Sequence, residues 1–207
     1  RSKATSKVLL GRGTGAGADP EKGRSAARDS EDKIKEVLEG TDMLFITAGM
    51  GGGTGTGASP IIAEVAKSMG ILTVAVVTKP FSFEGPIKKN NALAGIKNLK
   101  ENVDTLIAIP NDKLFEIPGM NITLLNAFKE ANGILKIGIK GISDLIMKQG
   151  TINLDFADIR SIMQNSGIAM LGFGEANGDE KAKSATAQAL NSPLLEKSIE
   201  GARKILI

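Results

Sequence analysis

The feature that most constrains the fold is a glycine-rich stretch, Gly49-Met50-Gly51-Gly52-Gly53-Thr54-Gly55-Thr56-Gly57. It follows an apolar run at residues 43–48 and precedes a helical pattern at residues 59–69. A strand, a glycine loop and a helix in this order present bare backbone N–H groups and a helix N-terminus to a bound phosphate. Because six glycines in nine residues carry a large entropic cost, we expect this loop to pass very close to a ligand. Phosphate is the first candidate.

The composition is that of a globular protein and removes several kinds of chemistry. The chain has 207 residues, 42% of them apolar and 24% charged, and it contains no cysteine and no histidine. Disulfides, thiolate metal sites and histidine acid–base catalysis are therefore excluded. Any reaction must use carboxylates, lysine, arginine, backbone dipoles or a hard cation held by oxygens.

Charge and hydropathy limit the expected partners. The net charge of +3 is small and spread along the chain, and Trp and Tyr are absent, so nucleic acid is not indicated. No apolar run approaches the roughly 20 residues that span a bilayer, and we expect no signal peptide. These features are compatible with the cytoplasm.

Alternating strand and helix patterns predict an α/β fold with a mostly parallel sheet. The expected strands are the apolar runs at residues 42–48, 71–78 and 104–110. Helical patterns at residues 59–69 and 87–100 connect them. Ligands of such sheets bind at the carboxyl ends of the strands. The glycine stretch and the loop at residues 79–86 are both expected at that edge.

A second glycine-rich loop occupies residues 11–18 and is followed by a predicted helix. Asp19 is the expected N-cap and Pro20 the first helical position. The helix is expected to reach about Leu38, with Gly40 ending it. Its expected buried residues are Ile34, Val37 and Leu38. The N-terminus of this helix is a second candidate anion site.

The second half of the chain begins with a helical pattern at residues 122–148. Gly133, Gly138 and Gly141 interrupt it, which predicts two helices or one helix with a break. A loop is expected at residues 149–154, and mixed helix and strand signals close the chain from residue 194. The further expected elements are a helix at 155–163, a strand at 168–174 and a helix at 179–190.

Three phosphate-binding patterns compete for the glycine stretch. The P-loop pattern fails because no lysine follows any of its glycines. The dinucleotide pattern matches at Gly53, Gly55 and Ala58, but it requires an acid at the end of the next strand. Residues 70–78 contain no carboxylate. An NAD(P)-dependent oxidoreductase therefore remains an alternative with weak support.

The third pattern, Gly51-Gly52-Gly53-Thr54-Gly55-Thr56-Gly57, is the G-G-G-T-G-[ST]-G motif of the tubulin/FtsZ family of GTPases. The chain resembles this family, and especially its bacterial cell-division members, from about Gly15 to Ile207. The resemblance includes the segments Gly15-Ala16-Gly17-Ala18-Asp19-Pro20-Glu21, Val76-Val77-Thr78-Lys79-Pro80-Phe81 and Asn153-Leu154-Asp155-Phe156-Ala157-Asp158. A plasmid-partitioning or archaeal tubulin-like filament is the rival within the family.

The resemblance implies a three-layer Rossmann-like GTPase domain with a mostly parallel sheet, a long central helix and the start of a second α+β domain. The implied divisions are residues 1–121, 122–150 and 151–207. Compared with the family, the chain is expected to lack the first strand and its glycine loop, and also the last strands and the tail peptide. A nucleotide-incompetent assembly fragment is therefore a further alternative.

The implied ligand is GTP or GDP, with Mg²⁺ held by the phosphates and no protein metal ligand assigned. The implied phosphate-binding residues are Ala16, Gly17, Ala18, Gly51, Gly52, Gly53, Thr54, Gly55 and Thr56. Glu84 matches a ribose-binding carboxylate, and Lys88 stands where the family has an arginine. Phe128 and Asn132 match residues that contact guanine. Without the family, Phe128 is interpreted as core, Glu84 as an ordinary loop acid, and Asn132 as a polar residue on a solvated face.

Asp155 and Asp158 support two interpretations. From the residues alone they are a helix-capping pair, with Asp155 as N-cap. The resemblance implies that both are catalytic and position the attacking water in the nucleotide site of the next subunit.

The implied protein is a cytoplasmic GTPase that polymerises head-to-tail into the filaments of the bacterial division ring at mid-cell. Its implied partners are further copies of itself, together with division-ring adaptors and regulators. Nucleic acid binding and direct membrane insertion are not expected.

Overall fold

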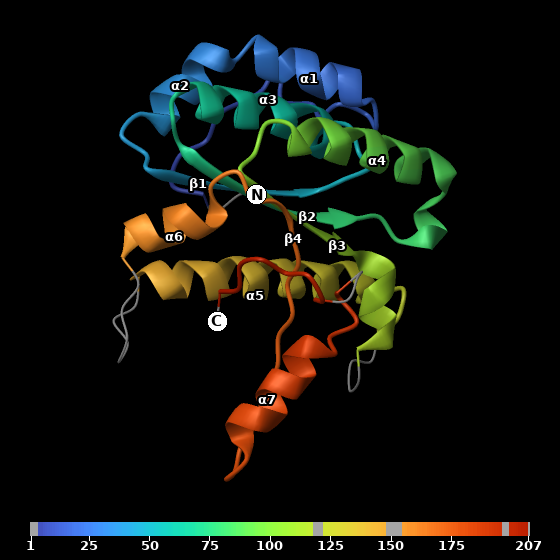
Figure 1. Cartoon of the computed structure of the whole chain (residues 1–207). Helices are drawn as coiled ribbons and strands as arrows, with labels where there is room; N and C mark the ends of the chain where they lie inside the picture. The colour runs from blue at the N-terminus through green and yellow to red at the C-terminus, as the bar shows by residue number, and fades with distance from the viewer. Residues whose placement is uncertain (1–3, 118–121, 148–154, 196–198, 207) are drawn as a thin grey trace.

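A parallel sheet lies at the centre of the computed structural model, which describes residues 4–117, 122–147, 155–195 and 199–206 (Figure 1). Its strands are hydrogen-bonded in the order β1-β2-β3-β4. They are β1 (Met43–Gly49), β2 (Leu72–Lys79), β3 (Thr105–Pro110) and β4 (Gly167–Ala169). All neighbouring strands pair in parallel. The α/β fold with a mostly parallel sheet is therefore confirmed.

The apolar character of β2 follows from its place inside the sheet. It pairs with β1 on one side and β3 on the other, and all its residues except Lys79 are buried. Val74 and Val76 face one hydrophobic cluster, whereas Ala75 and Val77 face another. Because side chains alternate along a strand, a strand covered on both faces is a continuous apolar run.

Four helices lie on one side of the sheet. They are α1 (Pro20–Arg28), α2 (Glu31–Leu38), α3 (Thr54–Ser68) and α4 (Pro86–Lys100). α3 and α4 pack on the sheet through a cluster that includes Ala63, Leu99 and Leu106. α1 packs on the outside of α3, where Ala27 and Ala58 share a small buried cluster. Figure 1 shows these helices together above the strands.

The other side of the sheet carries α5 (Ala127–Met147) and α6 (Phe156–Met163). Both contribute to a large hydrophobic cluster, for example through Ile134 and Ile159, which are 1% and 0% exposed. Two short 3-10 helices follow the central strands: η1 (Ser82–Glu84) is separated from β2 by two residues, and η2 (Asn111–Glu116) follows β3 directly. α7 (Lys181–Leu190) projects away from the sheet (Figure 1).

The predicted break in the long helical segment is wrong. α5 is one helix through Gly133, Gly138 and Gly141. A Cβ at Gly138 would lie 2.7 Å from Leu171 Cδ2, so this glycine permits close packing instead of ending the helix. The start of the helix was also placed too early, since α5 begins at Ala127 and leaves Leu124 and Leu125 exposed.

The single helix predicted from Pro20 to Leu38 is two helices. The Ser30 hydroxyl donates to the Ala26 carbonyl and the Ser30 N–H to the Ala27 carbonyl, so α1 closes at Arg28. α2 then begins at Glu31 in a new direction. Ile34 and Leu38 are buried as predicted, but Val37 is half-exposed.

The strand predicted at residues 168–174 is confined to β4. Beyond it the chain approaches the backbone of α7 too closely for a side chain. A Cβ at Gly172 would lie 2.2 Å from the Ala189 carbonyl oxygen, and one at Gly174 would lie 2.0 Å from that of Ala185. The segment thus packs on α7 and leaves the sheet. The predicted loop at 149–154 lies outside the described residues, and residues 194–195 and 199–206 form no helix or strand.

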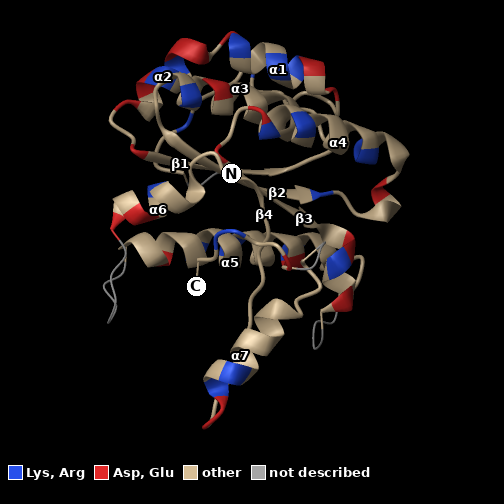
Figure 2. Cartoon of the chain, viewed as in Figure 1, with Lys and Arg blue, Asp and Glu red and all other residues tan. Residues whose placement is uncertain are grey.

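Charged side chains of both signs are interspersed on α1 and α2 (Figure 2). Arg28 joins three helices, because its guanidinium contacts Glu64 at 2.6 Å and Glu31 at 2.7 Å. The hydrogen bonds with Glu64 and then Glu31 raise the pKa of Arg28 above its ordinary value. Within the described part of the chain, no helix is both long and apolar enough to cross a membrane.

Candidate functional site

The glycine stretch forms the turn between β1 and α3, at the carboxyl edge of the sheet. α3 begins at Thr54 and not at residue 59 as predicted, so the second half of the motif is its first helical turn. Gly53 is the N-cap, and no side chain of the described residues caps this end of the helix. The first N–H groups of a helix have no acceptor within it. The donors at Thr54, Gly55 and Thr56 therefore remain open to an anion.

Three motif glycines are required by contacts within the protein. A Cβ at Gly57 would lie 2.0 Å from the Pro20 carbonyl oxygen, and one at Gly53 would lie 2.9 Å from the Asp19 nitrogen. A Cβ at Gly55 would lie 2.8 Å from the Gly49 carbonyl oxygen. Close packing of α1, α3 and β1 thus accounts for these positions without a ligand.

Gly51 also meets a neighbouring backbone closely, since a Cβ on it would lie 2.8 Å from the Lys88 carbonyl oxygen, whereas Gly52 does not. Gly51 adopts a φ of 108°, a conformation that other residues rarely reach, and its N–H donates to the buried Thr56 hydroxyl at 2.8 Å. Thr56 therefore stabilises the conformation of the motif through this buried hydrogen bond. Among the described residues, no atom lies within 4 Å of a Cβ built on Gly52, so their packing does not require glycine there. This open space beside the free donors suits a phosphate.

The loop of Ala16, Gly17 and Ala18 lies against the glycine motif. Ala16 is buried, and its Cβ would lie 2.6 Å from a Cβ on Gly53. Gly17 and Ala18 are exposed and have φ values of 57° and 62°. A left-handed alanine is uncommon and often marks a functional loop. The structure thus brings together both sets of predicted phosphate-binding residues.

Asn91 links these two loops and was missed in the sequence. Its side-chain amide donates to the Ala18 carbonyl at 3.4 Å and to the Gly51 carbonyl at 3.5 Å. No local pattern could reveal this residue, because its partners lie 73 and 40 positions away.

The N-terminus of α1, the second candidate anion site, is capped by a side chain of the protein itself. The Asp19 carboxylate accepts from the N–H groups of Glu21 at 3.0 Å and Lys22 at 3.4 Å. A side chain of the protein already occupies this helix end. The predicted capping by Asp19 and the start at Pro20 are both confirmed.

Glu84 and Lys88 face each other beside the motif. Glu84 Oε2 accepts from Lys88 Nζ at 3.0 Å, and Oε1 accepts from the Phe81 N–H at 3.0 Å. The Glu84 side chain is 12% exposed and that of Lys88 is 44% exposed. Glu84 is therefore a fixed, largely buried carboxylate and not an ordinary loop acid. A Cβ on Gly51 would lie 2.8 Å from the Lys88 carbonyl oxygen, which places α4 against the motif.

An aromatic cluster lies beyond this pair, at the ends of β2 and β3. Phe81 is buried, and the rings of Phe83, Phe115 and Phe128 pack around it at centroid distances of 4.9, 5.6 and 5.6 Å. Phe128 is 51% exposed, so its interpretation as a core residue is wrong. Asn132 is exposed one turn further along α5. Phe128 and Asn132 thus offer a flat ring and an amide on one helix face.

Asn111 is a second residue that sequence reasoning missed. It follows β3 directly and is 4% exposed, yet its Oδ1 is buried without a hydrogen-bond partner among the described residues. Asp112, its neighbour, accepts from Ser82 and so joins η2 to η1. A buried acceptor without a donor is costly. A donor from a bound base or an ordered water would satisfy it.

Asp155 and Asp158 lie at the other end of the molecule. The Asp155 carboxylate accepts from the Asp158 N–H at 2.8 Å, and the Asp158 carboxylate accepts from the Asp155 N–H at 3.4 Å. The predicted capping pair is therefore present. Figure 1 shows α6 beside the C-terminal end of α5, whereas η2 and the loop after β2 lie beside its N-terminal end. The structure does not bring the two carboxylates to the glycine motif of their own chain.

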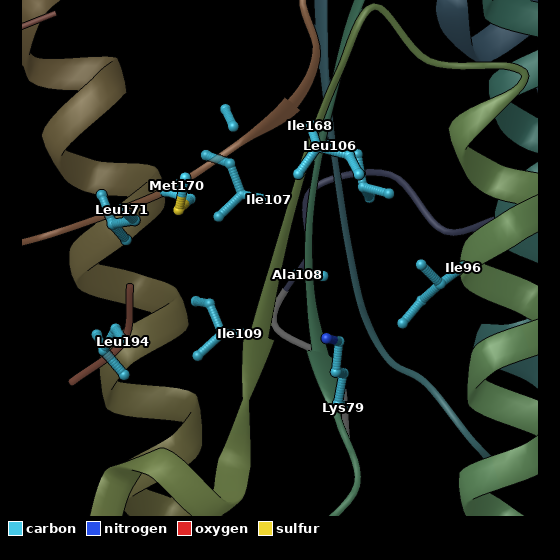
Figure 3. A pocket seen from close by; sticks show the side chains of 11 residues that line it. Lys79, Ile96, Leu106, Ile107, Ala108, Ile109, Ile168, Met170, Leu171 and Leu194 are labelled. Carbon is cyan, nitrogen blue, oxygen red and sulfur yellow. The ribbon is translucent and has the colours of Figure 1, made fainter. Parts of the chain in front are cut away.

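An apolar cavity of about 330 Å³ lies elsewhere, between α4, β3 and the segment after β4 (Figure 3). Its lining includes Ile96, Ile109, Met170 and Leu194. It contains none of the predicted site residues. The dinucleotide alternative also lacks support, because β2 ends at Thr78 and Lys79 without a carboxylate, and Ala58 is buried under α1.

Comparisons with known proteins agree with this arrangement. A model of the Tubulin/FtsZ family, GTPase domain, matches residues 2–119, and one of the FtsZ family, C-terminal domain, matches residues 167–207. The cell division protein FtsZ of Coxiella burnetii (strain RSA 493 / Nine Mile phase I) is 56% identical over 212 residues. That match covers 100% of this chain and 55% of the relative, so this chain spans about half the relative's length.

Solved structures give the same result. An empty FtsZ dimer from M. jannaschii superposes with a TM-score of 0.90 at 50% identity, covering 94% of this chain and 57% of that chain. CetZ from Methanosaeta thermophila strain DSM 6194 superposes with a TM-score of 0.70 at 23% identity, covering 84% and 50%. The second similarity shows the fold alone.

Proposed function

Because this chain belongs to the tubulin/FtsZ family of GTPases, we propose that it binds GTP and GDP and hydrolyses GTP within a head-to-tail filament of its own copies. The filament would serve bacterial cell division, with the protein in the cytoplasm at the division site. Division-ring adaptors and regulators are proposed as further partners. The proposed functional divisions are residues 1–121, 122–150 and 151–207.

The phosphates would lie on the uncapped N-terminus of α3, against Gly51, Gly52 and Gly53. The open donors of its first turn and the open space at Gly52 support this placement. The amides of Ala16, Gly17 and Ala18 would contact the γ-phosphate from the facing loop. Mg²⁺ would bind the phosphates and offset their charge. Within the described residues, no group of three carboxylates gathers into a cation site.

The nucleoside would extend along the edge towards the aromatic cluster. Glu84 would accept from a ribose hydroxyl, and Lys88 would keep the carboxylate neutralised beside the phosphates. The guanine would pack on the exposed Phe128 ring. Asn132 and the unpartnered Oδ1 of Asn111 would bond with its polar edge.

The observation that carries the shared-site proposal is the separation of the carboxylates from the glycine motif. α5 has 21 residues, and at 1.5 Å per residue it is about 31 Å long. The aromatic cluster lies at its first turn, and α6 lies at its far end. Asp155 and Asp158 would therefore act on the GTP of the next copy. A contact of this head-to-tail kind does not close, and it produces open filaments.

In the proposed reaction, a water oxygen attacks the γ-phosphorus in line as the bond to the bridging oxygen of GDP breaks. One oxygen of each carboxylate is used in the capping pair, and the other has no partner among the described residues. These two free oxygens would accept hydrogen bonds from the water and orient it. Phosphoryl transfer depends mainly on such positioning and on charge stabilisation.

The test is GTP turnover per subunit as a function of protein concentration, with GTP binding and light scattering measured in parallel. We expect binding at all concentrations, and turnover that rises steeply where scattering appears. A dilute monomer that hydrolyses as fast as the polymer would overturn the shared site. A chain that binds no GTP would support the nucleotide-incompetent alternative.

A further inference from the structure

The C-terminal turn of α6 is held from outside the helix. Helix geometry leaves the last carbonyl groups without an intrahelical donor. Lys204 Nζ donates to the carbonyls of Ser161 at 2.7 Å and Ile162 at 3.1 Å. Lys204 comes from the chain's last segment, 42 and 43 positions away. It therefore ties α6 to a part of the chain remote in sequence.

The sheet holds the same turn from the other side. Thr105 Oγ1, at the start of β3, donates to the Met163 carbonyl at 2.6 Å, and Thr105 is 2% exposed. The neighbouring Asp104 carboxylate accepts from the Asn165 N–H at 3.2 Å and from the Thr73 N–H, at the start of β2, at 2.9 Å. Two strands of the sheet thus fasten the base of α6.

Among the described residues, the N-terminal turn of α6 packs on the hydrophobic cluster through Phe156 and Ile159 but receives no hydrogen bond from another element. Asp155 and Asp158 are exposed, and within the described part of the chain each carboxylate accepts only from the N–H of the other residue. The buried residues of the helix are Ile159, directly after Asp158, and Met163 at its C-terminal end. Hydrogen bonds from other elements therefore hold the C-terminal turn of α6, and the exposed carboxylates lie at its opposite end.

We propose that Thr105, Asp104 and Lys204 are positioning residues for hydrolysis, which fix the direction in which α6 presents Asp155 and Asp158. This inference rests on the proposed shared site. In the described structure, the hydrogen bonds of these three side chains reach neither the two carboxylates nor the glycine motif. Their effect should therefore appear in turnover within the polymer and not in nucleotide binding. A displacement of 1 Å in a catalytic group can lower a rate by about 100-fold.

The test compares two pairs of variants in the full chain. Thr105→Val removes the hydroxyl and keeps the shape of the side chain, whereas Thr105→Ser keeps the hydroxyl. Lys204→Met removes the ammonium at an exposed position where loss of folding is not expected, and Lys204→Arg keeps a cation. Asp158→Ala is measured alongside, together with the affinity for GTP, polymer yield and turnover at saturating protein concentration.

We expect Thr105→Val and Lys204→Met to keep wild-type GTP affinity and polymer yield and to lose about five- to tenfold in turnover. Thr105→Ser and Lys204→Arg should recover most of it. Wild-type turnover in the first two variants, with Asp158→Ala inactive, would overturn the positioning role alone. Parallel loss of affinity and turnover would mean that these residues only support the fold, and it would also overturn that role. Wild-type turnover in Asp158→Ala would overturn the proposed function itself.

Discussion

The carbonyl oxygen of Pro20 lies 2.0 Å from the position that a Cβ on Gly57 would occupy. The first turn of α1 is thus pressed against the first turn of α3 with no room for a side chain. Ser59, two residues further on, is also buried and donates to the Gly55 carbonyl at 2.6 Å. Close packing of two helices is therefore one requirement on the glycine motif, and the proposed approach of a phosphate is a second.

Substitution of Gly57 and Gly52 should separate these two requirements. Gly57→Ala should lower the free energy of unfolding by about 1–3 kcal/mol, because the added methyl group overpacks the contact with α1. Gly52→Ala should change it by less than about 1 kcal/mol, since its Cβ would meet open space. Chemical denaturation without nucleotide measures both values.

In GTP binding, Gly52→Ala should be the more impaired of the two variants. Gly52→Ala should weaken the affinity at least about tenfold, because its methyl group would enter the space proposed for a phosphate. If Gly52→Ala binds GTP as tightly as the wild type, the phosphate does not lie against Gly52.

Lys88 should contribute to nucleotide affinity through charge and little to folding. Lys88→Met should weaken GTP binding about three- to tenfold, because Glu84 would then keep an uncompensated charge close to the phosphates. The cost in folding free energy should be at most about 1 kcal/mol, since the Lys88 side chain is 44% exposed. Titration calorimetry at low and high salt measures the affinity.

Lys88→Arg is the matched control, because it keeps the cation and adds a bidentate fork. It should bind GTP at least as well as the wild type. An affinity of Lys88→Met that equals the wild-type value at both salt concentrations would contradict the role proposed for this pair.

Phe128 and Phe115 provide a further matched comparison. Both rings pack at 5.6 Å from Phe81, and the two residues are 51% and 47% exposed. Replacing either by alanine should cost about 1–2 kcal/mol of folding free energy. Only Phe128→Ala should also weaken GTP binding, by about tenfold or more, because guanine is proposed to pack on that ring. Equal affinities in the two variants would place the base elsewhere.

Local sequence patterns predict those parts of the fold whose signals lie within the element itself. β2 is a continuous apolar run because it is buried on both faces, and Asp19 and Asp155 cap helices whose starts they mark in the sequence. The breaks were not predictable in the same way. Ser30 ends α1 by a side-chain bond to Ala26, and Gly138 sits within α5 because Leu171 packs on it. Both depend on contacts that periodicity does not contain.

The candidate site was predictable mainly where a motif carries it. The glycine stretch indicates phosphate by its own chemistry. The proposed roles of Glu84, Phe128 and Asn132 are implied only by the resemblance to the family. Asn91 and Asn111 could not be predicted from the sequence. Asn91 matters because its hydrogen-bond partners are remote in sequence, and Asn111 because its buried Oδ1 has no partner among the described residues. The residues next to an asparagine in the sequence indicate neither remote hydrogen-bond partners nor a missing one.

The most direct test of the central claim is a mixture of two inactive variants, Asp158→Ala and Gly52→Val. The first should bind GTP without hydrolysing it, and the second should lack GTP but keep intact carboxylates. If the site is shared, one of the four kinds of contact in an equal mixture combines a bound GTP with intact carboxylates. GTP turnover should then recover to at most about a quarter of the wild-type rate. A mixture that stays as inactive as its components, although both variants enter the same filaments, would contradict the shared site.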